Sequence, residues 1–255
     1  MSLTALVGHT GFVGSNLLSQ AHFDECYNSK NIQQIQGKSF DLLVCAGVYA
    51  EKWKANQNPE MDRQNISLLL QPLEKVRAKK FLLISTVDVY KNPVGVSEKD
   101  KVVTEGLHPY GLHRYQVEEW AYQHFPDCLV VRLPGLFGKG LKKNFIYDMI
   151  HNNLLHLTDH RSQFQFYDLK DLWQHILIAQ KQGLKLVHFA TEPVSVQEVA
   201  RQGFGIDFSN TTEKAPVYYD LKTIHHDLYH GAGNYLYRKT EVLARIKSFV
   251  QGERK

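Results

Sequence analysis

The chain has 255 residues, of which 43% are hydrophobic and 22% charged, and its 30 Lys and Arg against 26 Asp and Glu give a formal net charge of +4. This composition is that of a globular protein with a full core, and it excludes a disordered chain, a collagen-like chain and a disulfide scaffold. No run of Lys or Arg exceeds two residues. The mild basic excess therefore favours an anionic small molecule over nucleic acid as the partner.

Cysteine usage and hydropathy bear on the compartment. Cys26, Cys45 and Cys128 are widely separated and lie in or beside apolar runs, so we expect buried thiols in a reducing compartment and no metal site. The longest apolar stretch, residues 42–50, is about half as long as a membrane span. A strand, not a signal peptide, is expected almost at the N-terminus. We therefore expect a cytoplasmic protein without membrane contact.

The first half of the chain alternates short apolar runs with helical patterns. Strands are expected over residues 4–7, 26–28, 42–46, 81–85 and 128–133, and helices over residues 12–20, 32–36, 65–77 and 110–124. Buried parallel strands read as short apolar runs, so this alternation predicts an α/β fold with a Rossmann-type doubly wound parallel sheet. The stretch between the second and third runs is too short for a further strand. We therefore expect the sheet to lack one edge strand.

The second half is less regular. Helices are expected over residues 145–151, 169–182 and 240–250, and a strand over residues 186–190. Ser195 and Glu198 have the spacing of a capping box and predict a helix start. No linker separates the two halves, which favours one interwoven structure over two independent domains.

A glycine-rich segment, Gly-His-Thr-Gly-Phe-Val-Gly over residues 8–14, joins the first strand to the first helix. Gly8 permits a tight turn, Gly11 a close approach of the backbone to a pyrophosphate, and Gly14 close packing of helix on strand. The helix start offers unpaired N–H groups and the positive end of its dipole to phosphate. A dinucleotide-binding loop is therefore predicted, with cofactor contacts at Gly8, Thr10, Gly11, Phe12, Val13 and Gly14.

The end of the second strand bears on the choice between NAD and NADP. An acidic residue at this point binds the ribose 2′-hydroxyl of NAD and disfavours the 2′-phosphate of NADP. The sequence instead places Asn28, Ser29 and Lys30 there, all compatible with phosphate. We assign these residues to cofactor binding and favour NADP over NAD.

Two later segments add to the pattern. Residues 81–90 read as a strand that ends in Ser-Thr-x-x-Val-Tyr, and residues 109–114, Pro-Tyr-Gly-Leu-His-Arg, as a helix start with Tyr-Gly-x-x-Arg. The chain also contains Arg-Leu-Pro-Gly-Leu-Phe-Gly over residues 132–138 and Phe-Tyr-Asp over residues 166–168. On these four segments and the glycine loop, the chain resembles the extended short-chain dehydrogenase/reductase family. This group contains nucleotide-sugar epimerases, dehydratases and keto-sugar reductases.

The resemblance implies a catalytic pair. Tyr110 would exchange a proton with the substrate and Thr86 would hydrogen-bond the reacting oxygen, while nicotinamide takes or gives a hydride. A free phenol has a pKa of about 10 and is a poor base, so it needs a nearby positive charge. Position 114 shares the helix face of Tyr110. Arg114 stands there in place of the family's usual Lys, and its rigid fork is not equivalent to an ammonium.

The resemblance also implies the division of the chain and its remaining contacts. Residues 1–140 would mainly form the NAD(P)-binding domain, and residues 141–255 a substrate-binding region interwoven with the last strands. Further cofactor contacts are expected at Ala46, Gly47, Ser85 and Leu133, besides Tyr110 and Arg114. Substrate contacts are expected at Asp88, Tyr49, Trp53, Pro134, Gly135, Asn144 and Tyr167. For Asp88, a role as a loop cap is an equally good interpretation as a substrate contact. For Trp53, a place in the core is equally good.

We therefore expect an NAD(P)-dependent enzyme that acts by hydride transfer on a small molecule, a nucleotide sugar. Epimerase and keto-sugar reductase both stay open, whereas Val87 after Thr86 disfavours a dehydratase, which would have adjacent acidic residues there. The alternative is a non-catalytic NAD(P)-binding sensor or scaffold, for which Arg114 is the only support. A homodimer is a further expectation of the resemblance.

Overall fold

The computed structural model describes residues 3–253. They form two compact units, each assembled from separate stretches of chain: unit 1 contains residues up to 92, 101–132 and 172–187, and unit 2 contains residues 93–100, 133–171 and those from 188 onward. The chain passes from unit 1 to unit 2 after Arg132. Residues 172–187 then return to unit 1.

A six-stranded sheet with the order β2-β1-β3-β4-β5-β9 forms the centre of unit 1. Its strands are β1 (Thr4–Val7), β2 (Glu25–Tyr27), β3 (Ser39–Cys45), β4 (Arg77–Thr86), β5 (Cys128–Leu133) and β9 (Leu186–His188). β1 pairs in parallel with β2 and β3, and β3 pairs in parallel with β4. The predicted Rossmann-type α/β fold is confirmed.

Within residues 3–253, the sheet ends at β2, with no further strand beyond it. The chain between β2 and β3 forms only a short 3₁₀ helix, η1 (Ile32–Ile35), whose two isoleucines are buried in the core of unit 1. The predicted loss of one edge strand is therefore confirmed. The segment is too short to leave the sheet and return as another strand, so it covers the sheet edge with apolar side chains instead.

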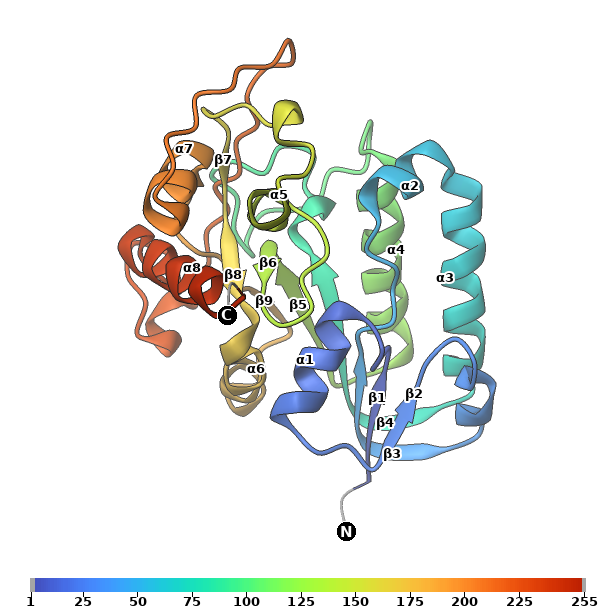
Figure 1. Cartoon of the computed structure of the whole chain (residues 1–255). Coiled ribbons are helices and arrows are strands. Elements are labelled where there is room, and N and C mark those ends of the chain that lie inside the picture. The colour runs from blue at the N-terminus through green and yellow to red at the C-terminus, as the bar shows by residue number, and fades with distance from the viewer. Residues whose placement is uncertain (1–2, 254–255) are drawn as a thin grey trace. The chain divides into compact units, whose positions relative to one another are not determined.

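The helices of unit 1 form two groups. α1 (Phe12–Gln20) contacts α6 (Leu172–Lys181), while α3 (Pro59–Leu73) and α4 (Pro109–His124) lie side by side away from them, with the short α2 (Lys52–Gln57) against both (Figure 1). α3 begins earlier than predicted because the Asn58 side chain accepts a hydrogen bond from the Met61 amide (3.1 Å) and a proline follows this cap. The sequence of α2 is too short and polar to predict a helix.

The described residues of unit 2 contain two small sheets and three α-helices. β6 (Gly135–Phe137) pairs in parallel with β8 (Phe166–Asp168), and β7 (Gln163–Phe164) pairs antiparallel with β10 (Val194–Ser195). The helices are α5 (Phe145–His151), α7 (Val196–Glu198), which continues as a π-helix over Val199–Phe204, and α8 (Lys239–Glu253). The predicted capping box of Ser195 and Glu198 is present. Within residues 3–253, no helix has both the length and the apolar character to cross a membrane.

The glycine-rich loop has little room for side chains at two positions. Gly8 has a φ of +88°, and a Cβ atom built on it would lie 2.5 Å from the carbonyl oxygen of Ala46. A Cβ atom on Gly14 would lie 2.0 Å from the carbonyl oxygen of Gly8. The loop is therefore in backbone contact with both the start of α1 and the end of β3. The positive φ of Gly8 agrees with the predicted tight turn.

Substitution of Gly14 by alanine tests this packing. We expect Gly14→Ala to lower the free energy of unfolding by about 1–3 kcal/mol, because the added methyl group forces the backbone apart. Gly252→Ala is the matched control, since Gly252 also lies in a helix but its Cβ atom would meet nothing within 4 Å. The control should be neutral or stabilise by up to roughly 1 kcal/mol. Equal effects in urea unfolding followed by circular dichroism would contradict the assigned contact.

Candidate active site

The loops that carry the predicted site leave the sheet at one edge, because parallel strands end on the same side. β1, β3 and β4 are followed by the glycine loop, by residues 46–51 and by residues 87–90. Residues 46–49 link the two halves of the site: Ala46 is in contact with Gly8, and the carbonyl oxygen of Tyr49 accepts a hydrogen bond from Arg114. The predicted cofactor and catalytic residues of unit 1 are thus brought together.

The glycine loop fits an anionic group. α1 begins after Gly11, with no side chain capping its first turn and no acidic residue in it, so neither its N–H groups nor its dipole is neutralised there. Thr10 and Gly11 are exposed, and Phe12 and Val13 are half-buried. Close backbone packing at Gly8 and Gly14 leaves no room for side chains at these two positions and makes the turn narrow, as a pyrophosphate requires.

The end of β2 forms a hydrogen-bonded turn without an acidic residue. The side chain of Asn28 accepts a bond from the Lys30 amide (2.9 Å), and its Nδ2 lies 3.1 Å from Nε2 of His9 in the glycine loop. Ser29 and Lys30 are exposed. Glu25, the acidic residue within β2, forms an ion pair with Lys38 (2.8 Å). Sequence reasoning missed His9, whose contact joins segments that are far apart in the chain.

Tyr110 lies in the first turn of α4, which two polar side chains cap. The Tyr110 amide donates to Oδ1 of Asn56 (3.0 Å), and the Gly111 amide donates to Nδ1 of His108 (3.0 Å). A Cβ atom on Gly111 would lie 2.2 Å from the carbonyl oxygen of Asp88. The glycine of the Tyr-Gly motif therefore lets α4 pack directly on the loop that follows Thr86.

The phenol of Tyr110 is buried and close to Thr86. Burial raises the pKa of Tyr110 to about 12, while the charge of Arg114 and a hydrogen bond with the Thr86 side chain act to lower it. Asp88 and Lys52 act in opposite directions on the same phenol. Arg114 thus lowers the pKa of Tyr110 as expected, but burial raises that pKa by more. Tyr110 is therefore protonated at neutral pH.

Arg114 is buried and held by its neighbours. Its guanidinium lies over the Tyr110 ring, 4.0 Å from the ring centroid, and forms a bidentate ion pair with Asp62 of α3, with one N–O distance of 2.9 Å. Arg114 is 4% exposed and Asp62 is 6% exposed. The guanidinium also donates to the carbonyl oxygen of Tyr49. A Lys ammonium has no fork to form this set of contacts.

His113 extends the same buried cluster. It is 2% exposed, its Nδ1 lies 2.7 Å from Asp62, and its Nε2 accepts a hydrogen bond from Nε of Arg63 (3.0 Å). These partners place the proton of a neutral ring on Nδ1. Sequence reasoning missed both Asp62 and His113. The only available signal was the position of His113 next to Arg114, and nothing local pairs either residue with Asp62.

A second buried ion pair lies farther along α4. Arg132 binds Glu118 in a bidentate manner (Nε–Oε1, 3.0 Å) and donates to the hydroxyl of Tyr90 (2.7 Å). Ser85, expected to contact the cofactor, donates its hydroxyl to Glu118. This network anchors α4 on the ends of β4 and β5.

Three of the predicted substrate residues lie in unit 1. Asp88 forms an ion pair with Lys52 of α2 (2.7 Å), a residue that sequence reasoning missed. Tyr49 and Trp53 are exposed by 53% and 60%, respectively, so both aromatic side chains are accessible. Trp53 is therefore not a core residue.

The other predicted substrate residues lie in unit 2. Tyr167 is fully buried, with its ring stacked on Tyr237 at 6.1 Å, and this placement makes it a core residue and not the substrate ligand expected. Asn144 caps α5 by accepting from the Ile146 amide (3.0 Å), and its Nδ2 donates to the carbonyl oxygen of Leu136 (2.8 Å). Of the two remaining substrate candidates, Pro134 is buried and Gly135 is exposed. Leu133, which was predicted to contact the cofactor, is buried.

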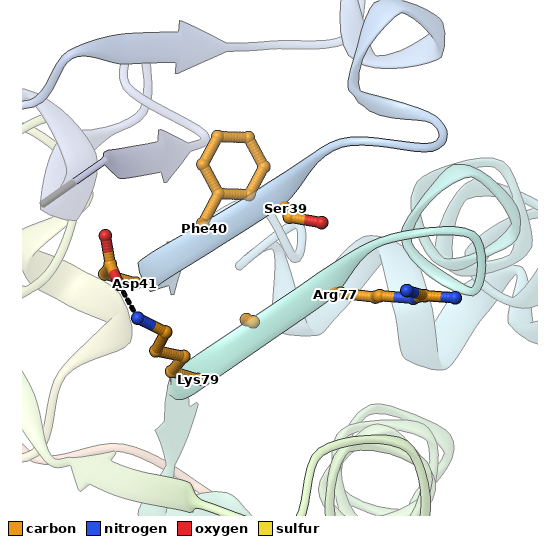
Figure 2. A pocket seen from close by; sticks show the side chains of 6 residues that line it. Ser39, Phe40, Asp41, Arg77 and Lys79 are labelled. Atoms are coloured by element: carbon orange, nitrogen blue, oxygen red, sulfur yellow. Dashed lines mark ion pairs between the residues drawn. The ribbon is translucent and has the colours of Figure 1, made fainter.

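A shallow hollow of about 450 Å³ lies elsewhere in unit 1, at the amino ends of β3 and β4. Ser39, Phe40, Asp41, Arg77 and Lys79 line it, and Lys79 pairs with Asp41 at 2.6 Å (Figure 2). Thr86 and the glycine loop lie at the carboxyl ends of the strands. The hollow is therefore separate from the candidate active site, and no predicted site residue lines it.

The buried Glu118–Arg132 pair generates a stability prediction. Glu118→Ala should lower the free energy of unfolding by about 3–5 kcal/mol, because it leaves the Arg132 charge buried without a partner. Asp127→Ala is the control, because its pair with Lys185 is exposed by 53% and 56% and should contribute less than about 1 kcal/mol. A loss below about 1 kcal/mol for Glu118→Ala in urea unfolding would show that the pair does not anchor α4.

Comparison with known proteins shows which fold this is. A UDP-N-acetylglucosamine 4-epimerase from Methanobrevibacter ruminantium is 13% identical, with a TM-score of 0.75 over 98% of each chain. A dTDP-4-dehydrorhamnose reductase from Bacillus anthracis, solved with NADP, is 16% identical, with a TM-score of 0.72 over 98% of this chain and 99% of that one. MoeE5, solved with UDP-glucuronic acid and NAD, is 16% identical, with a TM-score of 0.73 and the same coverage.

These matches extend over nearly the whole of each chain, and at such identities they establish the fold alone. The predicted resemblance to the extended short-chain dehydrogenases/reductases is confirmed at this level. No protein-family model matches the sequence, and no curated protein does either.

Proposed function

We propose that the chain is an NAD(P)-dependent keto-sugar reductase of the extended short-chain dehydrogenase/reductase type, acting on a nucleotide sugar. The observation that carries this proposal is the group formed by Thr86, Tyr110 and Arg114 at the carboxyl edge of a Rossmann-type sheet. The fold is shared with a UDP-N-acetylglucosamine 4-epimerase solved with UDP-N-acetylmuramic acid, with a dTDP-4-dehydrorhamnose reductase solved with NADP, and with MoeE5 solved with UDP-glucuronic acid and NAD. These neighbours support the cofactor and the substrate class.

The cofactor would be held by the glycine loop and the end of β2. The narrow turn at Gly8 and Gly11 and the open first turn of α1 suit its pyrophosphate. Asn28, Ser29 and Lys30 offer hydrogen-bond donors and a cation but no carboxylate, which favours the 2′-phosphate of NADP over the 2′-hydroxyl of NAD. When bound, the nicotinamide would supply the hydride.

The protonation state of Tyr110 favours reduction. Reduction of a carbonyl group needs a proton donor beside the developing alkoxide, and a protonated phenol supplies one. Burial raises the pKa of Tyr110 to about 12, so the protonated phenol is available as this donor at neutral pH. Thr86, which hydrogen-bonds the phenol, would position the substrate oxygen against it.

Removal of the Tyr110 hydroxyl tests the proposal directly. Tyr110→Phe should reduce kcat about 10²–10⁴-fold, because the positioned proton donor is lost. The assay follows NADPH absorbance with a panel of keto nucleotide sugars. Tyr115→Phe is the matched control on the same helix and should keep wild-type turnover. Full turnover by Tyr110→Phe would refute the assignment. NADPH binding without turnover of any substrate by the wild type would favour the non-catalytic alternative.

The cofactor preference has its own test. Asn28→Asp should weaken NADPH binding at least about tenfold while NADH binding is weakened less, because a carboxylate at this position disfavours the 2′-phosphate. Gln33→Glu adds the same charge at an exposed site nearby and should leave the ratio of the two affinities unchanged. Both dissociation constants are measured by fluorescence titration. If Asn28→Asp leaves the ratio of the NADPH and NADH affinities unchanged, the 2′-phosphate of NADP does not bind at Asn28.

A further inference from the structure

The contacts of Arg114 use almost all of its hydrogen-bond donors. The N–H groups on its two Nη atoms bind the Asp62 carboxylate, the carbonyl oxygen of Tyr49 and, at 3.5 Å, the carbonyl oxygen of Tyr110. Its Nε–H is buried and has no partner within residues 3–253. Buried donors are nearly always paired, since an unpaired one costs free energy. The one donor of Arg114 without a partner, which lies on the residue against Tyr110, therefore points to a ligand that supplies the acceptor.

Asp62 determines how Arg114 is presented. Its carboxylate takes one N–H from each Nη atom, so the guanidinium plane is fixed on the face of the Tyr110 ring. The carboxylate is itself fixed by His113, which is held in turn by Arg63. A Lys at position 114 could neither form this fork nor retain a further donor in a fixed direction. Asp62 and Arg114 thus act as one unit in place of a single Lys.

We propose that Asp62 is a positioning residue of the active site: it holds Arg114 against Tyr110, offsets its charge and leaves Nε–H to bind a hydroxyl oxygen of the dinucleotide ribose. This inference rests on the proposed function, since it requires a dinucleotide at the site. Within residues 3–253, Asp62 bonds to Arg114 and His113 and not to Tyr110, so we expect it to act on the phenol through Arg114. Its substitution should therefore have no effect on the site once Arg114 is removed.

The experiment is a double-mutant cycle of Asp62→Asn and Arg114→Met, with NADPH affinity as its first readout. Asp62→Asn should weaken NADPH binding about tenfold in the wild-type background, the loss expected for one hydrogen bond. In the Arg114→Met background it should change the affinity less than about twofold. Asp62→Glu is the second variant, because it keeps the buried charge but displaces the carboxylate. It should weaken NADPH binding several-fold, again only when Arg114 is present.

The ionisation of Tyr110 is the second readout, because loss of helix packing alone would not make it depend on Arg114. Difference absorbance against the matching Tyr110→Phe variant isolates this phenolate. Asp62→Asn should raise the Tyr110 phenolate about tenfold at a given alkaline pH, because the Arg114 charge is no longer offset. No rise is expected when Arg114→Met is also present.

The outcomes separate the two proposals. If the Asp62 variants change both readouts only when Arg114 is present, the positioning role is supported. If they leave the readouts unchanged, or change them equally in both backgrounds, it is overturned. If Asp62→Asn does not fold, the same comparison is made with Asp62→Glu, and its result decides between these outcomes. A wild-type protein that binds neither NADPH nor NADH overturns the proposed function, and the positioning role with it.

Discussion

The buried ion pair between Asp62 and Arg114 is the constraint on which the site depends. It joins α3 to α4 at the point where Tyr110 begins the latter helix, and through the carbonyl oxygen of Tyr49 it includes the loop that follows β3. Two charges buried this deeply are tolerated only when they are paired and hydrogen-bonded. Any movement of α4 relative to α3 would break that pairing, so the position of the phenol is fixed by electrostatics as much as by packing.

The backbone around this pair is equally restricted. Gly8 lies against Ala46, and Gly111 lies against Asp88, with no space for a Cβ atom at either position. The first contact fixes the predicted phosphate loop and the second fixes the start of α4, both relative to strands of one sheet. A rigid edge with two such contacts can present a phosphate site and a proton donor at a constant separation, which is the condition for transfer between a bound dinucleotide and a substrate.

Local sequence patterns predicted the sheet, the missing edge strand and the bounds of α1, because each depends on periodicity or on short-range glycine chemistry. The proximity of Thr86 to Tyr110 also followed from motifs. The partners of these residues did not. Asp62 and His113 lie on different helices, and His9 meets Asn28 across a strand, so their pairing exists only in the folded chain. Tyr167 resembles a site residue in sequence, but its aromatic neighbours in unit 2 bury it completely.

If the proposed function holds, the glycine loop and Tyr110 bind opposite ends of one dinucleotide. A crystal structure of the protein with NADPH should then show the pyrophosphate on the turn from Gly8 to Gly14 and the nicotinamide ring beside Tyr110. A ribose oxygen should be bonded to Nε of Arg114. A dinucleotide bound away from the glycine loop, or one whose nicotinamide lies far from Tyr110, would contradict it.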